Sequence, residues 1–264
     1  MKSIKNLQNK TNPLIKGAWV TLGIPFDLPM VIEKNEGIID VEALIMTTLL
    51  MMEHDRILTD LPAWINRFSS LINHQKLKTM FKTMSGEKRD VVLENLNQDL
   101  FRSIPKSFQS VFSLKELSPS SISENVNMRL QKLNTIEHVA QTSCMIHHRL
   151  LYGTGFRADL ITLTNIEGLR MKGTQLAELL CTNNSTISRI LNDLKACRFL
   201  DEDNERIGQI ESYPGMFIST QSLWNLCDMI DAYRFSFEEL KRDVFENLNL
   251  KYDVFSRKII TKLV

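Results

Sequence analysis

Glycine, proline and cysteine are scarce in this sequence. Of 264 residues, only 10 are glycine, 7 are proline and 4 are cysteine. Glycine and proline are the main turn-forming residues, and here apolar residues recur three and four positions apart. This combination disfavours an architecture of strands and tight turns. The chain is therefore expected to be mainly α-helical.

The few cysteines carry no motif. Cys144, Cys181, Cys197 and Cys227 are widely spaced, and the sequence contains no CxxC pair. Such spacing is not typical of a disulfide-stapled secreted domain or of a zinc ribbon. Cys181 and Cys197 fall inside helical apolar patterns, where a free cysteine behaves as a small hydrophobic residue. A reducing, cytoplasmic setting is the expectation.

Long apolar runs are also missing. The longest, from Ala43 to Met52, contains two threonines and is about half the length needed to span a bilayer. The first six residues carry charge but no apolar stretch follows them, so no signal peptide is predicted. We expect a chain without membrane contact.

The charges nearly cancel, and the formal net charge is +1. A protein that binds nucleic acid through its overall charge would be much more basic. Any binding of DNA must therefore depend on basic groups gathered in one place.

Composition and periodicity divide the chain into four parts. Residues 1–36 are expected to form an irregular N-terminal arm with room for a short strand, anchored by Trp19 and Phe26. A helical domain for dimerisation or partner binding follows over 37–152. A third domain is predicted over 153–215 and a C-terminal helical extension over 216–264.

Helices are predicted from apolar spacing and from capping residues. Asp40 is the expected N-cap of the first strong helix, and Pro62 is expected in the first turn of a helix over Ala63–Ile72. A linker is predicted at Ser118–Ser123. The other predicted helices are Lys88–Ile104, Pro105–Leu114, Val126–Tyr152 as one long helix ended by Gly153, Phe156–Leu163, Gln221–Tyr233 and Phe237–Leu248.

The most informative stretch runs from Gly173 to Lys195 and predicts two helices joined by a polar turn. A short helix over Thr174–Cys181 precedes Thr182-Asn183-Asn184, whose side chains compete for backbone hydrogen bonds. Asn184 or Ser185 is the expected cap of a second helix from about Thr186 to Ala196. In that helix an apolar stripe repeats at helical spacing, and it comprises Ile187, Ile190, Leu191 and Leu194. The opposite face is small and polar.

This segment resembles the helix-turn-helix of the winged-helix regulator superfamily in its MarR-like form. The resemblance covers residues 157–210, roughly a fifth of the chain, with Phe156–Leu163 similar to the family's preceding helix. Phe199-Leu200 and Ile207–Ile210 are similar to the strands of its two-stranded β-wing. Cys181 stands where the family usually has glycine, and the wing is acidic. The expected fold is a helical N-terminal domain, a winged helix-turn-helix and C-terminal helices.

The resemblance implies a sequence-specific regulator of transcription that binds double-stranded DNA as a homodimer, a repressor rather than an enzyme, and without a cofactor. The helix over 185–196 would enter the major groove. Carried over residue by residue, the positions that read bases are Ser185, Thr186, Ser188, Arg189 and Asn192. Those that contact phosphates are Lys172, Thr174, Lys195 and Arg206.

Other functions have weaker support. Gly153-x-Gly155-x-x-Ala158 matches a dinucleotide-binding string, but a helix rather than a buried strand is predicted before it. Cys144, His147 and His148 could supply two metal ligands but no complete site. The sequence contains no Walker loop, GxSxG or HExxH motif. The main alternative is a protein-interaction module or antitoxin-like adaptor that uses the winged helix as a docking surface, an alternative that the acidic wing favours.

Overall fold

The computed structural model describes residues 15–26, 37–51, 56–96, 104–113, 124–164, 171–201 and 216–218, and most of these residues are helical. The expectation of a mainly α-helical protein is confirmed. Several predicted features lie outside the described residues. They are the linker Ser118–Ser123, the wing residues 202–210 with Arg206, and the helices Gln221–Tyr233 and Phe237–Leu248.

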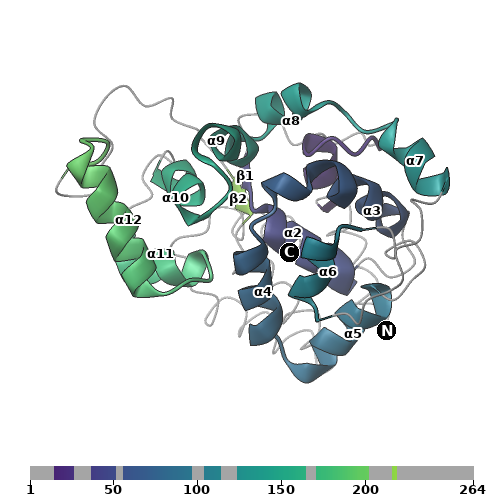
Figure 1. Cartoon of the computed structure of the whole chain (residues 1–264), viewed down its shortest axis with the longest axis horizontal. Coiled ribbons are helices and arrows are strands. Elements are labelled where there is room, and N and C mark those ends of the chain that lie inside the picture. Colours follow the sequence, from purple (N-terminus) through teal and green to yellow (C-terminus); the bar gives the residue numbers. More distant parts are fainter. Residues whose placement is uncertain are drawn as a thin grey trace, which may run out of the picture.

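A body of short helices surrounds the buried helix α2 (Figure 1). Every residue of α2 except Leu50 is buried, and α2 packs against α3, α4 and α5. The elements of the body are, in chain order, a helix over residues 15–21, α2 (Val41–Met51), α3 (Ile57–Phe68), the 3₁₀ turn η1 (Ser69–Leu71), α4 (His74–Thr83), α5 (Gly86–Leu96), α6 (Lys106–Val111), α7 (Glu124–Leu130), α8 (Ile136–Thr142) and α9 (Cys144–Tyr152).

The predicted cap of α2 is confirmed and the predicted start of α3 is wrong. Asp40 Oδ1 accepts a hydrogen bond from Ala43 N (3.1 Å), which satisfies a free N–H in the first turn of α2. Helix α3 begins at Ile57, so that Pro62 lies in its second turn. The residues from Ile57 to Leu61 bury enough apolar surface to extend the helix before the proline, which lacks only the N–H that would bond the Leu58 carbonyl.

The stretch predicted as one helix over Val126–Tyr152 forms three helices, α7, α8 and α9. Thr135 Oγ1 accepts from His138 N (3.4 Å) and caps α8, and Ser143 Oγ accepts from Ile146 N (3.4 Å) and caps α9. Side chains that satisfy the first N–H groups of a helix favour a start at that point over continuation. Gly153, with φ of 83°, ends α9 as predicted.

The described part of the N-terminal arm, residues 15–26, begins with a helix, where an irregular segment was expected. Residues 15–21 form a helix whose Trp19 is fully buried and donates from Nε1 to Thr48 Oγ1 (2.8 Å). Trp64 donates to the Leu22 carbonyl (2.7 Å), and the two indoles meet edge to face with centroids 5.2 Å apart. Trp19 therefore anchors this segment to the body, as expected, and Phe26 packs partly buried against the same core.

The described strands form a two-stranded parallel sheet outside the region predicted for the wing. β1 (Gly37–Ile39) pairs with β2 (Met216–Ile218) in the register Ile38 to Phe217. The pairing brings together segments that are almost 180 residues apart in the sequence, and β1 contacts α9 (Figure 1).

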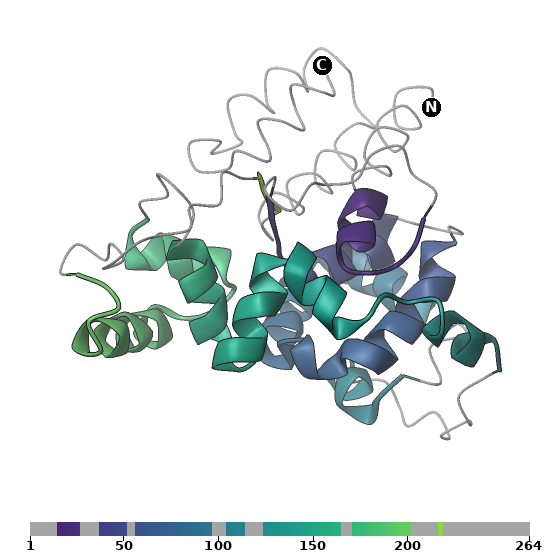
Figure 2. The ribbon, with the colours of Figure 1, turned by 90° about the horizontal axis from the view of Figure 1, so that it is seen from above.

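Three further helices extend from one side of the body, as two perpendicular views show (Figures 1 and 2). They are α10 (Phe156–Thr164), α11 (Gly173–Leu179) and α12 (Asn184–Ala196). α10 packs against α9, and α11 packs against α12. Among the described residues, no helix combines the length and the hydrophobicity needed to cross a membrane.

Candidate nucleic-acid interface

Helix α11 starts with an exposed end and buries one side. The N–H of Lys172 donates to Oε1 of Gln175 (2.9 Å), which holds the chain as it enters the helix. Leu176, Ala177 and Leu179 are buried, so α11 presents its remaining side chains to solvent. Lys172 and Thr174 are both exposed there, as an interface with a phosphate backbone requires.

The turn after α11 depends on one residue with a left-handed backbone. Cys181 has φ of 51°, and Thr182 N donates to the carbonyl of Ala177 (2.8 Å). Glycine adopts this conformation without strain. The pattern of residues placed Cys181 inside the helix Thr174–Cys181, but α11 ends at Leu179 and Cys181 lies in the turn. Only the resemblance had placed a turn residue at this position.

Helix α12 starts at Asn184 and is capped by Asn183, one residue earlier than the predicted caps. Asn183 Oδ1 accepts from Thr186 N (2.8 Å) and from Ser185 Oγ (2.7 Å). The predicted caps Asn184 and Ser185 lie inside the first turn instead, because a cap needs an extended backbone and Asn183 has ψ of 155°.

The two faces of α12 are arranged as the sequence predicted. Ile187, Ile190, Leu191 and Leu194 are buried. Ser185, Ser188, Arg189 and Asn192 are exposed, and Thr186 and Lys195 are partly exposed. Eight of the nine predicted site residues therefore reach solvent, seven on α11 and α12 and Lys172 just before α11. The ninth, Arg206, lies outside the described residues.

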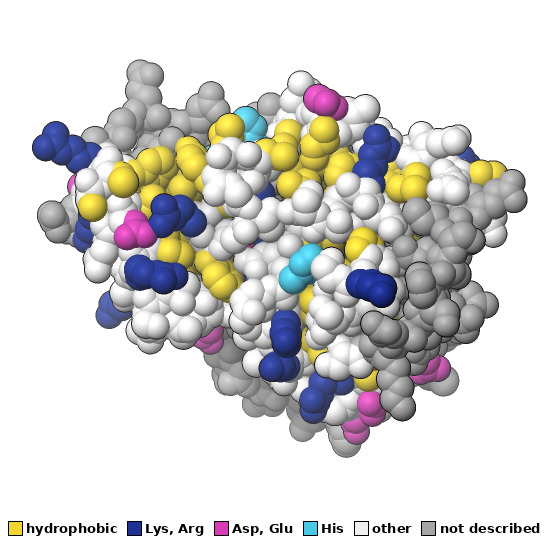
Figure 3. Space-filling model, in the orientation of Figure 1, with side chains coloured by type: hydrophobic (Ala, Val, Ile, Leu, Met, Phe, Trp, Pro, Cys, Tyr) yellow, Lys and Arg dark blue, Asp and Glu magenta, His cyan; other side chains and the backbone are white. Residues whose placement is uncertain are grey.

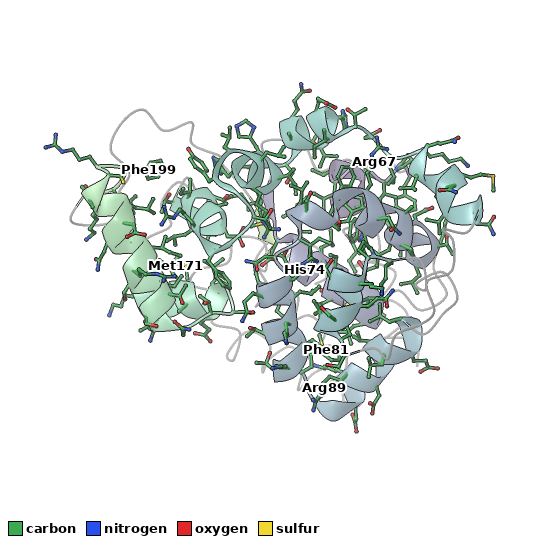
Figure 4. The ribbon with its side chains drawn as sticks, in the orientation of Figure 1. Arg67, His74, Phe81, Arg89, Met171 and Phe199 are labelled. Carbon is green, nitrogen blue, oxygen red and sulfur yellow. The ribbon has the colours of Figure 1, made fainter. Side chains whose placement is uncertain are left out.

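Two apolar side chains close the ends of the α11–α12 unit (Figure 4). Met171 precedes α11 and Phe199 follows α12, and both pack partly buried against the core. Phe199 N also donates to the Leu194 carbonyl (2.8 Å), so the chain turns back onto α12. Cys197, expected inside an apolar pattern, is instead exposed at the C-terminal end of α12, because the helix ends before it.

Basic and acidic side chains are interspersed on this part of the surface (Figure 3). Over 171–201 the chain has four basic residues, Lys172, Arg189, Lys195 and Arg198, and three acidic residues, Glu178, Asp193 and Asp201. One ion pair that sequence reasoning missed adds a basic residue from outside this range. Arg157 of α10 pairs with Asp193 of α12 through Nη2 and Oδ2, 2.5 Å apart, and so offsets one of the three acidic charges.

A buried ionic cluster ties α10 to the body. Arg149 of α9 donates from Nε and Nη2 to Asp159 of α10 (2.8 and 2.9 Å) and from Nη1 and Nη2 to Glu42 of α2 (both 2.8 Å). Lys76 of α4 donates to Asp40 (2.7 Å) and lies 3.7 Å from Glu42 and from Asp159. None of these five side chains is exposed to solvent.

Opposite charges inside the cluster offset the cost of burying Glu42 and Lys76. Burial alone would raise the pKa of the Glu42 carboxyl, but the charges of Arg149 and Lys76 outweigh burial and lower it. Burial likewise opposes the charge of Lys76, but Asp40, Asp159 and Glu42 raise its pKa. Separating the helices that carry these groups, α2, α4, α9 and α10, would leave a buried charge unpaired. The cluster therefore holds these helices in a fixed arrangement.

His74 is the first residue of α4 (Figure 4), and it is close enough to Glu42 of this cluster to feel its charge. Burial lowers the pKa of His74, and the charge of Glu42 opposes the effect. Among the described residues, neither His74 Nε2 nor Asn73 Nδ2 has a hydrogen-bond partner although both atoms are buried. The ring of His74 meets Phe108 edge to face.

The cysteine and histidines of α9 do not form a metal centre. Cys144 Sγ lies 3.6 Å from His148 Nδ1, which also contacts Thr162 Oγ1 (3.0 Å). His138, expected farther along the same helix, belongs to α8. In the described part of the chain, no three His, Cys, Asp or Glu side chains are placed to hold a metal ion.

The end of α9 presents apolar side chains to solvent. Leu150, Leu151 and Tyr152 are 48%, 62% and 44% exposed. Leu150 also lines a cavity of about 390 Å³ between α3, α8 and α9, together with Phe68 and Ile136.

Comparison with known proteins gave no assignment. No protein-family model matches the chain, and no curated protein and no solved structure is significantly similar to it.

Proposed function

We propose that this protein is a sequence-specific DNA-binding regulator of transcription, a repressor with a MarR-like winged helix-turn-helix. The observation that carries the proposal is the exposed polar face of α12, on a helix whose opposite side is fully packed. A helix held by one face, with short donors and acceptors on the other, suits insertion into a major groove.

The side chains on that face match the chemistry of base edges. Arg189 can donate two hydrogen bonds to O6 and N7 of guanine, and Asn192 can pair with N6 and N7 of adenine. Ser185 and Ser188 are small enough to let the helix approach the bases closely. Thr186 lies at the edge of the same face and is partly exposed.

Residues around the helix would contact the DNA backbone. Lys172 and Thr174 lie at the start of α11 and Lys195 near the end of α12, and all three reach solvent. Such contacts fix the register of a protein on the duplex and supply most of the salt-dependent affinity. The proposal also includes two features that rest on the sequence: Arg206 as a further phosphate contact and the two-stranded wing over 199–210.

The proposal includes a homodimer on a palindromic site, because two-fold symmetry presents two recognition helices to two half-sites. The exposed apolar end of α9, Leu150–Tyr152, is the surface among the described residues that suits such an association. Sedimentation of the purified chain with and without a selected duplex measures the stoichiometry.

Selection from a pool of duplexes with a randomised core tests the function. The wild-type chain should enrich a defined sequence at low salt, and Arg189→Ala should lose affinity for it by about 1–3 kcal/mol and relax the preference at one base position. Arg89→Ala on α5 is the matched control, since Arg89 is an exposed arginine on another part of the molecule (Figure 4). Equal enrichment by Arg189→Ala would mean that another face is used.

A second candidate function is a protein-interaction module or adaptor. It is favoured by the near balance of charges over 171–201 and by the exposed leucines at the end of α9. A stoichiometric partner that co-purifies with the chain, together with no enrichment of any duplex, would support this function over DNA binding. In this function the winged helix is the docking surface, so Arg189→Ala should weaken binding of the partner, and Leu151→Asp tests whether the end of α9 also contributes.

A further inference from the structure

The ion pair between Arg157 and Asp193 joins two helices on the surface of the molecule. Arg157 stands in the first turn of α10 and Asp193 in the last half of α12, and their side chains are 51% and 45% exposed. Arg157 uses one nitrogen, Nη2, for this contact. Its other donors have no hydrogen-bond partner among the described residues, so they face solvent beside α12.

Asp193 lies at one edge of the polar face of α12. Successive residues are about 100° apart around an α-helix, which places Asp193 about 40° beyond Arg189. Lys195 lies at the other edge, about 160° from Asp193 across the exposed side. Ser185, Arg189 and Asn192 fall between these two edges.

A helix in the major groove has phosphates on both sides. The groove is about 12 Å wide and a helix with its side chains is about 10–12 Å across, so residues at the edges of the inserted face approach the two backbones. Lys195 supplies a cation for one side. On the other side α12 presents Thr186 and Asp193, and the charge of Asp193 would repel a phosphate. The cation on that side comes from α10 as Arg157.

We propose that Arg157 binds a backbone phosphate beside α12, and that Asp193 holds its guanidinium in position against that helix. The inference rests on the proposed DNA-binding function and extends it to a residue outside the helix-turn-helix. The ligand is a nucleic-acid phosphodiester, which an arginine with free donors binds through charge-assisted hydrogen bonds. The contact carries affinity but no base preference.

Salt dependence of binding to the selected duplex tests the proposal. Arg157→Ala should reduce the slope of log K against log salt by about 0.9, which corresponds to about eightfold weaker binding at about 0.1 M salt and no difference near 1 M. The preferred base sequence should stay the same. Arg89→Ala should leave both the slope and the affinity unchanged.

A second variant separates a phosphate contact from a structural strut. Both Arg157→Ala and Asp193→Ala remove the ion pair, so a strut predicts that they weaken binding equally. A phosphate contact predicts that Asp193→Ala weakens binding less than Arg157→Ala does, since it loses the positioning of the guanidinium but retains Arg157 and removes a negative charge. Thermal unfolding of both variants measures their fold independently of DNA.

The outcomes distinguish the two levels of the proposal. Should the wild-type chain enrich no duplex, the DNA-binding function fails and the role of Arg157 falls with it. Should wild type bind and Arg157→Ala keep the full salt slope, or Asp193→Ala lose as much affinity as Arg157→Ala, the phosphate contact is wrong and the function stands.

Discussion

Arg149 and Asp159 form a two-point ion pair, with Nε–Oδ1 and Nη2–Oδ2 distances of 2.8 and 2.9 Å, and neither side chain is exposed to solvent. Arg149 lies in α9, the last helix of the body, and Asp159 lies in α10, the helix that precedes α11 and α12. The pair therefore fixes the part of the chain that precedes the candidate interface. Its strength and its pH dependence can be measured directly.

Removal of the shared cation should destabilise the whole chain. Arg149→Met removes the hydrogen bonds that Arg149 donates to Glu42 and Asp159 and leaves Lys76, 3.7 Å away, as their remaining cation. The loss of one partner from a buried ion pair costs about 3–5 kcal/mol. Urea unfolding measures the change. Arg89→Ala, on the exposed side of α5, should stay within about 0.5 kcal/mol of wild type. A loss of similar size for both variants would contradict this description of the cluster.

Stability should fall in acid because of Glu42. Folding lowers the pKa of this carboxyl from its ordinary value of 4.5, so the folded state favours the charged form. The resulting contribution is fully present above the unfolded pKa and is lost as pH falls through the folded pKa. Glu42→Gln should be less stable near neutral pH but should lose less further stability as the pH falls below 4.5. Equal acid dependence in both proteins would show that Glu42 is not the group responsible.

The turn at Cys181 should discriminate between substitutions by backbone conformation. With φ of 51°, a β-branched side chain is strained, so Cys181→Val should be less stable than Cys181→Gly by about 1–2 kcal/mol. Cys197, with φ of −81°, provides the control, because there Val should be at least as stable as Gly. Chemical denaturation of the four variants gives the order. The same order at both positions would contradict the left-handed turn.

Local patterns predicted the candidate interface well, because its elements are set by neighbours in sequence. The stripe from Ile187 to Leu194 indicated which face of α12 is buried, and the polar residues Thr182-Asn183-Asn184 indicated a turn before it. The prediction failed at Thr135 and Ser143, because the apolar spacing there suggested one continuous helix. In the structure each of these side chains caps the start of a new helix, α8 and α9.

Sequence reasoning could not find the contacts that join distant residues. Glu42 and Arg149 are 107 positions apart and Arg157 and Asp193 are 36 apart, so no local spacing connects either pair. Each of these charges has an ordinary local interpretation, such as a residue in a first helical turn or on a solvated face. Only the packing of α2, α4, α9 and α10 brings the buried charges together.

The preference of the chain for particular DNA sequences tests the central claim most directly. Bound duplexes are sequenced after selection by wild type and by Arg189→Ala, with the salt concentration fixed. We expect wild type to yield one recurring sequence and the variant to lose its preference at a single base position while it retains weak, salt-dependent binding. Identical sequences from both proteins, or no enrichment by wild type, would contradict the assignment of α12 as the recognition helix.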